Sequence, residues 1–227
     1  MPFSEVSIEF LVENRLQDSR EWYKDHKDRY NKVLLEPFVE LVDRLAPDML
    51  EIDPQLITEA RVDRTLSRIY RDTRFSKDKM LYRDNMWLVF MREKKLYEGL
   101  PAFYFDMNPQ GFSYGMGYYQ ASTASMEAIR RLILADAPAF LAADKAFRSQ
   151  DVFTMEGDSY KKSRHPGASD DQRVWLDKKS ISFNHHSNDH DLLFSDKLAG
   201  TLLEGFRLLV PMYEFLCLAE VQRDVTK

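Results

Sequence analysis

The chain has 227 residues, of which 44% are hydrophobic and 13% aromatic, and its formal net charge is −5. A chain of this length can bury a large core, and this composition is that of a globular protein, which excludes a disordered one. The acidic balance argues against a protein that coats nucleic acid with its whole surface. We expect one domain over residues 1–227.

Membrane and secretory signals are missing from this sequence. The longest apolar runs, such as Met86–Met91, fall far short of the roughly 20 residues that a membrane-spanning helix needs. Acidic residues at Glu5, Glu9 and Glu13 interrupt the stretch where a signal peptide would be apolar. The single cysteine, Cys217, lies in an apolar stretch, as expected of a core thiol in a reducing compartment. We therefore predict a cytoplasmic protein with no membrane partner.

Two helices are predicted at the beginning of the chain. Ser4 can cap the first, and Asp18 with Glu21 can form a capping box for the second. Apolar and aromatic residues recur at spacings of three and four over residues 22–45, which predicts a long amphipathic helix. Pro37 should kink or divide this helix, and Pro47 should stop it.

The sequence changes character from residue 66. Segments rich in aromatic and β-branched residues and bounded by turn residues predict strands at Leu66–Tyr70, Asn85–Met91, Ala102–Met107 and Phe112–Tyr119. The turn residues 108–111 predict that the last two strands form an antiparallel hairpin. Gly115 and Gly117 fall on one face of the last strand, which indicates a bulge or the close approach of another element.

The second half of the chain is predicted to be mainly helical. Helical spacing covers residues 122–134, and Asp136 should cap a further helix that has Pro138 in its first turn. The polar, turn-rich stretch Glu156–Arg173 should be a mobile surface loop, and Ile181–Phe183 a short strand.

The last predicted element is a long helix. Ser195 or Asp196 should cap it, and Pro211 should break it locally. Together these elements predict an α+β fold with a mostly antiparallel sheet flanked by helices, and with long N-terminal and C-terminal helices.

Charge is distributed unevenly along the chain. Residues 1–67 carry 9 lysines and arginines against 15 acidic residues, residues 68–95 carry 9 against 4, and the remainder carries 14 against 18. The basic segment, Arg68–Arg83, therefore stands inside an otherwise acidic chain. Its candidate ligand-binding residues are Arg68, Tyr70, Arg71, Asp72, Arg74, Ser76, Lys77 and Lys79.

The residue types of the basic segment suit the recognition of an anion. Arginine binds phosphate or carboxylate through two parallel hydrogen bonds, and lysine adds a point charge. If the beginning of the segment is extended, Arg68 and Tyr70 project to one face while Ile69 and Arg71 project to the other.

Three functions stay open for the basic segment. The first is the binding of a small phosphorylated or carboxylated ligand; nucleic acid is a further partner that the net charge disfavours. The second is an enzyme, a hydrolase or transferase, in which the cations stabilise developing negative charge and Asp72 or Asp78 serves as acid, base or metal ligand. The third is a structural or interaction protein in which the segment forms an internal clasp of Arg–Asp pairs; breaking such a clasp would cost roughly 3 kcal/mol or more if it were buried. The sequence assigns no catalytic residue, cofactor or oligomeric state.

A histidine-rich tract covers residues 184–191 and includes His185, His186 and His190. Imidazole and carboxylate groups at this density could bind Zn²⁺. However, a His-His pair followed by a third histidine four residues later is not a recognised ligand spacing. We predict a surface loop between a strand and a helix, and no metal site.

The stretch RIYRDTRFSKDK at Arg68–Lys79 resembles the hallmark of the uncharacterised DUF2461 family. Further matches to the family pattern, in chain order, are Phe10, Leu11, Asn14, Trp22, Tyr23, Lys27, Tyr30, Pro101, Phe103, Tyr104, Gly115, Gly117, Tyr119 and the segment Glu156–Asp158. The chain departs from the pattern where Met80 and Leu81 replace Thr-Pro and Arg83 replaces lysine. The resemblance implies one DUF2461-like domain with a mixed α+β fold, and it carries no established activity.

Overall fold

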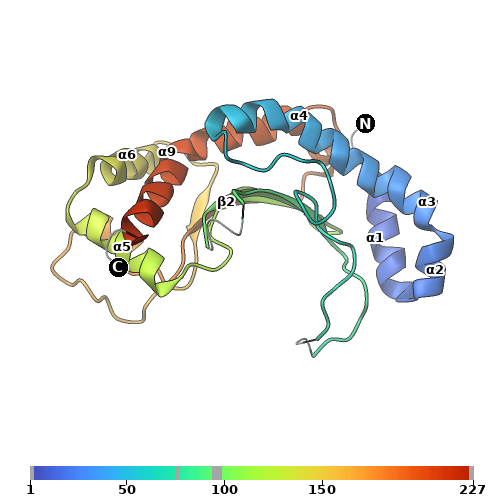
Figure 1. Cartoon of the computed structure of the whole chain (residues 1–227), viewed down its shortest axis with the longest axis horizontal. Coiled ribbons are helices and arrows are strands. Elements are labelled where there is room, and N and C mark those ends of the chain that lie inside the picture. Colours follow the sequence, from blue (N-terminus) through green and yellow to red (C-terminus); the bar gives the residue numbers. More distant parts are fainter. Residues whose placement is uncertain (1–2, 75–76, 94–98, 225–227) are drawn as a thin grey trace. The chain divides into compact units, whose positions relative to one another are not determined.

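The computed structural model describes residues 3–74, 77–93 and 99–224. In chain order the elements are α1 (Glu5–Gln17), α2 (Arg20–Asp25), α3 (Lys27–Tyr30), the π-helical η1 (Asn31–Leu35), α4 (Glu36–Ile52), β1 (Met86–Phe90), β2 (Ala102–Asn108), β3 (Gly111–Gly117), α5 (Thr123–Leu134), α6 (Pro138–Arg148), β4 (Thr154–Glu156), α7 (Asp170–Leu176), β5 (Ser182–Ser187), α8 (His190–Leu193) and α9 (Leu198–Asp224) (Figure 1). The strands form one five-stranded antiparallel sheet in the order β1-β2-β3-β5-β4. The predicted α+β fold is confirmed. None of the helices in the described ranges has the length and apolarity needed to cross a bilayer.

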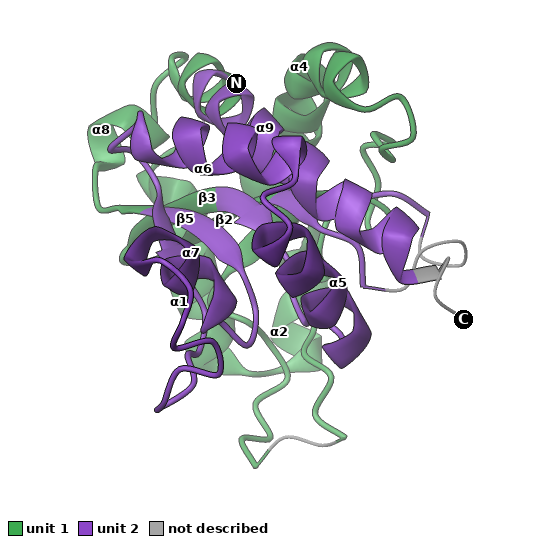
Figure 2. Ribbon diagram, turned by 90° about the vertical axis from the view of Figure 1, so that its left-hand side faces the viewer, with its two compact units in different colours: residues 1–90, 104–114, 186–203 green, residues 91–103, 115–185, 204–227 purple. Residues whose placement is uncertain are grey.

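The chain divides into two compact units (Figure 2). Unit 1 comprises residues 1–90, 104–114 and 186–203, and unit 2 comprises residues 91–103, 115–185 and 204–227. The expectation of one domain stays a prediction.

Helix α4 supplies much of the core of unit 1. One of its faces buries the apolar residues Phe38, Leu41, Val42, Leu45 and Met49. The ring of Phe3 lies 4.8 Å from that of Phe38 and 6.0 Å from that of Phe105 on β2. The amphipathic spacing predicted from the sequence therefore produces the buried face as expected.

The helix predicted over residues 22–45 is divided before α4 begins. Pro37 has no N–H for the carbonyl of Val33, and its ring crowds that carbonyl, so the preceding turn widens into η1. The hydroxyl of Ser7, which is only 1% exposed, donates to the Val33 carbonyl at 2.6 Å. The carbonyl that Pro37 leaves without its helical donor thus receives a hydrogen bond from α1.

Two predictions about helix ends are wrong. Helix α4 continues through Pro47 to Ile52, and burying Met49 beyond the proline, at about 1.5–3 kcal/mol, offsets much of the cost of about 3 kcal/mol for proline inside a helix. Ser19, rather than Asp18, caps α2 by accepting from the Trp22 N–H at 3.2 Å. Asp18 instead ends α1 in a left-handed conformation, with φ of 43°.

The strand predicted at Leu66–Tyr70 forms isolated bridges instead: Leu66 pairs with Val62 and with Leu88, and Tyr70 pairs with Tyr82. Ser67 explains the interruption. Its N–H donates to the Trp87 carbonyl at 2.9 Å, but its side-chain hydroxyl accepts the Trp87 N–H at 3.0 Å. A side chain therefore replaces a backbone acceptor, and a regular ladder does not form there.

Glycine in β3 permits a close approach by β5, as predicted. A Cβ atom built on Gly115 would lie 2.0 Å from the Phe183 carbonyl oxygen, and one on Gly117 would lie 2.4 Å from the Ser182 Cα. Gly117 also has φ of 157°, which side-chain-bearing residues rarely adopt. Both positions require glycine for steric reasons.

Unit 2 differs from the sequence expectation in its short elements. Helix α7 begins inside the predicted loop Glu156–Arg173, where Ser169 and Gln172 form a capping box. Ala137, rather than Asp136, is the residue before α6, and β4 was not predicted. Helix α9 runs through Pro211 without a break.

Candidate functional site

The two ends of the basic segment pair with each other in unit 1. The Arg71 N–H donates to the Leu81 carbonyl at 2.8 Å, and the Arg83 N–H donates to the Ile69 carbonyl at 3.0 Å. Residues 71–74 and 77–81 extend beyond this pairing and project from unit 1 in Figures 1 and 2. The basic segment is therefore a hairpin with a long loop.

The end of α1 holds this hairpin in place. The carboxylate of Asp18 accepts the N–H groups of Leu81 at 2.6 Å and Tyr82 at 3.3 Å. Arg15 donates to the Tyr82 carbonyl at 2.5 Å. These two residues lie more than 60 positions before their partners, and no local pattern in the sequence signals the contact. Aspartate tolerates the left-handed conformation that this position requires.

Asp78 is the centre of an ion cluster within the loop. Its carboxylate accepts from Arg15 at 2.8 Å, from Arg71, and from the Met80 N–H at 3.0 Å. The Met80 N–H, together with Arg15 and Arg71, holds the pKa of Asp78 well below its usual range. The side chains of both arginines are 21% exposed and that of Asp78 is 44% exposed, so the cluster is only partly shielded from water.

Two further Arg–Asp pairs are more exposed. Arg68 pairs with Asp63. Arg74 donates from Nη2 to the Asp72 carboxylate at 2.7 Å and from Nε at 3.0 Å, and its backbone N–H reaches the same carboxylate at 3.1 Å. These hydrogen bonds lower the pKa of Asp72 to about 2. Asp72 is therefore ionised at neutral pH and orients the Arg74 guanidinium.

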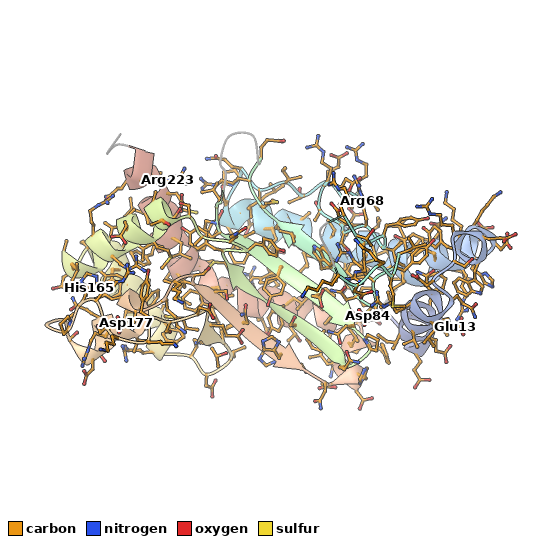
Figure 3. All side chains as sticks on the ribbon, turned by 90° about the horizontal axis from the view of Figure 1, so that it is seen from below. Glu13, Arg68, Asp84, His165, Asp177 and Arg223 are labelled. Carbon is orange, nitrogen blue, oxygen red and sulfur yellow. The ribbon has the colours of Figure 1, made fainter. Side chains whose placement is uncertain are left out.

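The arginines of the basic segment line one open groove of about 610 Å³. We call this the arginine groove; its lining residues are Asp63, Leu66, Ser67, Arg68, Tyr70, Arg71, Asp72, Thr73, Arg74, Arg83 and Trp87. Four arginines and two aspartates line it, an excess of two positive charges. Arg68 is labelled in Figure 3. The guanidinium of Arg83 lies over the Trp87 ring, 4.6 Å from its centroid.

The structure brings together five of the predicted site residues, namely Arg68, Tyr70, Arg71, Asp72 and Arg74. Lys77 and Lys79 are exposed and are not among the lining residues; the ammonium group of Lys79 donates instead to the Thr73 carbonyl at 2.8 Å. Ser76 lies outside the described residues.

Arg71 differs from the sequence expectation. Ile69 is buried, as the strand alternation predicts, but Arg71 lines the groove together with Arg68 and Tyr70. The strand-like pairing ends at residue 71, so the alternation no longer determines where its side chain lies, and Asp78 draws the guanidinium toward the loop. Sequence reasoning also left Asp63, Arg83 and Trp87 out of the ligand-binding set, because all three lie outside the family hallmark at Arg68–Lys79.

A cluster of four tyrosines supports one wall of the groove. The ring of Tyr70 lies 5.3 Å from Tyr23 and 4.8 Å from Tyr82, and Tyr30 lies 5.6 Å from Tyr23. The hydroxyl of Tyr82 donates to that of Tyr70 at 3.4 Å. Burial raises the pKa of Tyr23 to about 12, and the nearby Tyr70 adds to the shift. Tyr23 and Tyr30, which belong to the amphipathic pattern over residues 22–45, are therefore part of a ring cluster that reaches the edge of the arginine groove.

The histidine-rich tract shows no metal site in the described part of the chain. Within these residues, no group of three or more His, Cys, Asp or Glu side chains is placed to hold a metal ion. The prediction of a loop is wrong for part of the tract, since residues 184–187 belong to β5 and α8 begins at His190. Nδ1 of His185 lies 2.9 Å from the Val152 carbonyl oxygen.

A family model described as a conserved hypothetical protein (DUF2461) matches residues 6–215. No curated protein matches the chain.

Proposed function

The chain belongs to the DUF2461 family, and from this premise we propose that it binds a small phosphorylated or carboxylated molecule in the arginine groove. The observation that carries the proposal is the convergence of Arg68, Arg71 and Arg74 on one open groove. The family description names no activity, so the proposal rests on the chemistry of the groove.

Fixed guanidinium groups favour anion binding. Asp72 orients Arg74, and Asp78 orients Arg71, so these side chains lose little further rotamer freedom when a ligand arrives. The lining residues keep an excess of positive charge after the two aspartates among them are counted. A phosphate or carboxylate would therefore meet oriented donors and a favourable local charge.

The alternative of an internal Arg–Asp clasp accounts for some of the contacts around the groove. Asp78 ties Arg71 to Arg15, and this cluster fixes the loop to the end of α1. Because the Asp78 side chain is 44% exposed, breaking the cluster should cost far less than breaking a buried ion pair. The clasp therefore supports the groove rather than replacing it.

An enzymatic role for the two loop aspartates gains no support from their surroundings. The pKa of Asp72 is lowered to about 2, and that of Asp78 is lowered further. Carboxylates held in the ionised form are poor general acids and weak general bases near neutral pH. We therefore propose binding as the function of the groove.

The proposal is tested with anion titrations on a double variant, Arg68→Ala with Arg74→Ala. Wild-type protein should show a rise in melting temperature and saturable binding with phosphate, pyrophosphate or citrate. The double variant should bind at least about tenfold more weakly, since each removed arginine takes away charge-assisted hydrogen bonds.

Arg61→Ala is the matched control. Arg61 is an exposed arginine paired with Glu59, as Arg68 is paired with Asp63, but it is not among the groove-lining residues. Its replacement should leave the affinity within about twofold of wild type. Equal binding by the wild type and the double variant, or no binding of any anion by the wild type, would overturn the proposal.

A further inference from the structure

The arginine groove is larger than a simple oxyanion requires. Its volume of about 610 Å³ falls in the range of about 300–1,000 Å³ typical of pockets that hold whole small molecules. Inorganic phosphate would contact the arginines and leave most of this space to water. The groove therefore has room for a further part of a ligand beside its anionic group.

An aromatic side chain adjoins the arginines in this space. Tyr70 lines the groove, and 41% of its surface is exposed. Tyr23 packs against it edge-on at an interplanar angle of 72°, and Tyr82 supports it at 4.8 Å and through the hydroxyl contact. The ring is thus held in place while part of its surface stays open to the groove.

Trp87 adds a second aromatic group to the lining. Its ring carries the Arg83 guanidinium at 4.6 Å, so a cation and a flat apolar surface are presented together. Arginines beside aromatic rings form the combination with which proteins bind phosphate-bearing flat rings, the rings stacking while the guanidinium groups bind the phosphate.

The charge of the groove limits the length of such a ligand. Four arginines and two aspartates leave an excess of two positive charges, which matches the charge of about −1.5 to −2 on one phosphate monoester at neutral pH. The further phosphates of a polynucleotide would extend past the groove over a protein whose net charge is −5, and electrostatic repulsion would oppose their binding.

We propose that the ligand of the arginine groove is a phosphate monoester that carries a flat aromatic ring, as a nucleoside monophosphate does. The inference rests on the proposed anion binding and adds that Tyr70 stacks on the ring. The phosphate would lie among Arg68, Arg71 and Arg74, and the ring against the exposed surface of Tyr70.

The test compares ribose 5-phosphate, which has no aromatic base, with nucleoside monophosphates, which carry an aromatic base on the same sugar phosphate. Dissociation constants are measured by calorimetry for ribose 5-phosphate and for the four common nucleoside monophosphates, in the same buffer. The best nucleotide should bind wild-type protein about tenfold or more tightly than ribose 5-phosphate, the size expected from stacking on one aromatic side chain. The ratio of these dissociation constants reports the contribution of the aromatic base, because both ligands carry the same sugar phosphate and its contribution cancels.

Replacing Tyr70 should abolish the ratio. In Tyr70→Leu, which keeps an apolar side chain against Tyr23 and Tyr82, the ratio should fall to about one, whereas Tyr70→Phe should keep most of it. Tyr119→Leu is the control: this tyrosine is fully exposed and does not line the groove, so the ratio should stay as in wild type.

Each outcome decides a different claim. If ribose 5-phosphate binds but the nucleotides bind no tighter, or if Tyr70→Leu keeps the ratio, the inference about the ring is wrong and anion binding stands. If neither compound binds, the proposed function fails as well. Binding of a single-stranded oligonucleotide at least tenfold tighter than the best mononucleotide would replace the inference with a nucleic-acid interface.

Discussion

Asp106 is a residue whose protonation should couple to the stability of the fold. It lies on β2 in unit 1 and accepts from the Asn85 amide at 2.6 Å. Burial raises the pKa of its carboxyl to about 6; the nearby Asp84 adds to the shift, and Asn85, Asn108 and Arg83 oppose it. Above pH 6 the folded state therefore contains a buried, ionised carboxylate, and this lowers the free energy of unfolding.

The sign of the effect follows from proton binding. Between about pH 4 and pH 6 the folded chain binds a proton at Asp106 that the unfolded chain does not, so stability rises as the pH falls through this window. Asp106→Asn should remove this dependence. At pH 7.5 the variant should be more stable than wild type by up to about 3 kcal/mol, and near pH 4 the difference should vanish.

Urea unfolding at pH 4.0 and pH 7.5 measures the prediction for Asp106. The relevant quantity is the difference in free energy of unfolding between variant and wild type, because the other titrating groups contribute equally to both proteins. A difference that is the same at both pH values, or a variant that is less stable at pH 7.5, would show that the carboxyl carries no such cost.

At the scale of elements, the contact between β3 and β5 in unit 2 depends on glycine. Gly115→Ala would place a methyl carbon 2.0 Å from the Phe183 carbonyl oxygen, and backbone cannot give way as a flexible side chain can. The two strands would have to move apart. We expect a loss of about 3 kcal/mol in the free energy of unfolding, at the upper end of the cost of overpacking.

Gly200→Ala is the matched control for Gly115→Ala. Gly200 lies in α9, and apart from its chain neighbours and the adjacent helix backbone no atom lies within 4 Å of a Cβ atom built there. Alanine favours a helix over glycine by roughly 0.5–1 kcal/mol, so the same substitution should be neutral or stabilising at this position. A pair of urea midpoints that shift in the same direction would contradict the steric account of Gly115.

The elements also show where sequence reasoning succeeded and where it failed. Periodic apolar spacing correctly predicted the buried face of α4, and the alternating glycines of β3 correctly predicted that another element approaches this strand closely. The errors have local causes. The side-chain hydroxyl of Ser67 accepts the hydrogen bond that a backbone carbonyl would accept in a regular strand, and α4 continues beyond Pro47 with Met49 buried on its apolar face. Both errors depend on contacts with residues from other parts of the fold, and local sequence patterns do not reveal those contacts.

Across the whole molecule, the sequence identified the basic segment but not what surrounds it. Charge counting singled out Arg68, Arg71 and Arg74, and these side chains do meet in one groove. Arg15 lies in α1 and Asp18 directly follows it, and both are separated by more than 60 residues of chain from the loop residues that they hold. Contacts at this sequence separation depend on the tertiary fold, so neither charge nor spacing could have predicted them.

The division into two units raises the question of whether they unfold together. Domain boundaries usually fall in exposed linkers. Here one boundary follows the last residue of β1, and the other four fall inside β2, β3, β5 and α9, each of which contributes residues to both units. Because strands and helices are held by continuous hydrogen-bond ladders, unfolding one unit would require breaking elements of the other at these points.

We therefore predict a single cooperative transition for the whole chain. In calorimetry the measured and van 't Hoff enthalpies of unfolding should agree. Tryptophan provides a second measurement, since Trp22 and Trp87 belong to unit 1 and Trp175 to unit 2. In Trp175→Phe the fluorescence reports unit 1 alone, and its urea curve should coincide with the far-ultraviolet circular dichroism of the same variant. Separate midpoints, or two calorimetric peaks, would show instead that the units are independent domains.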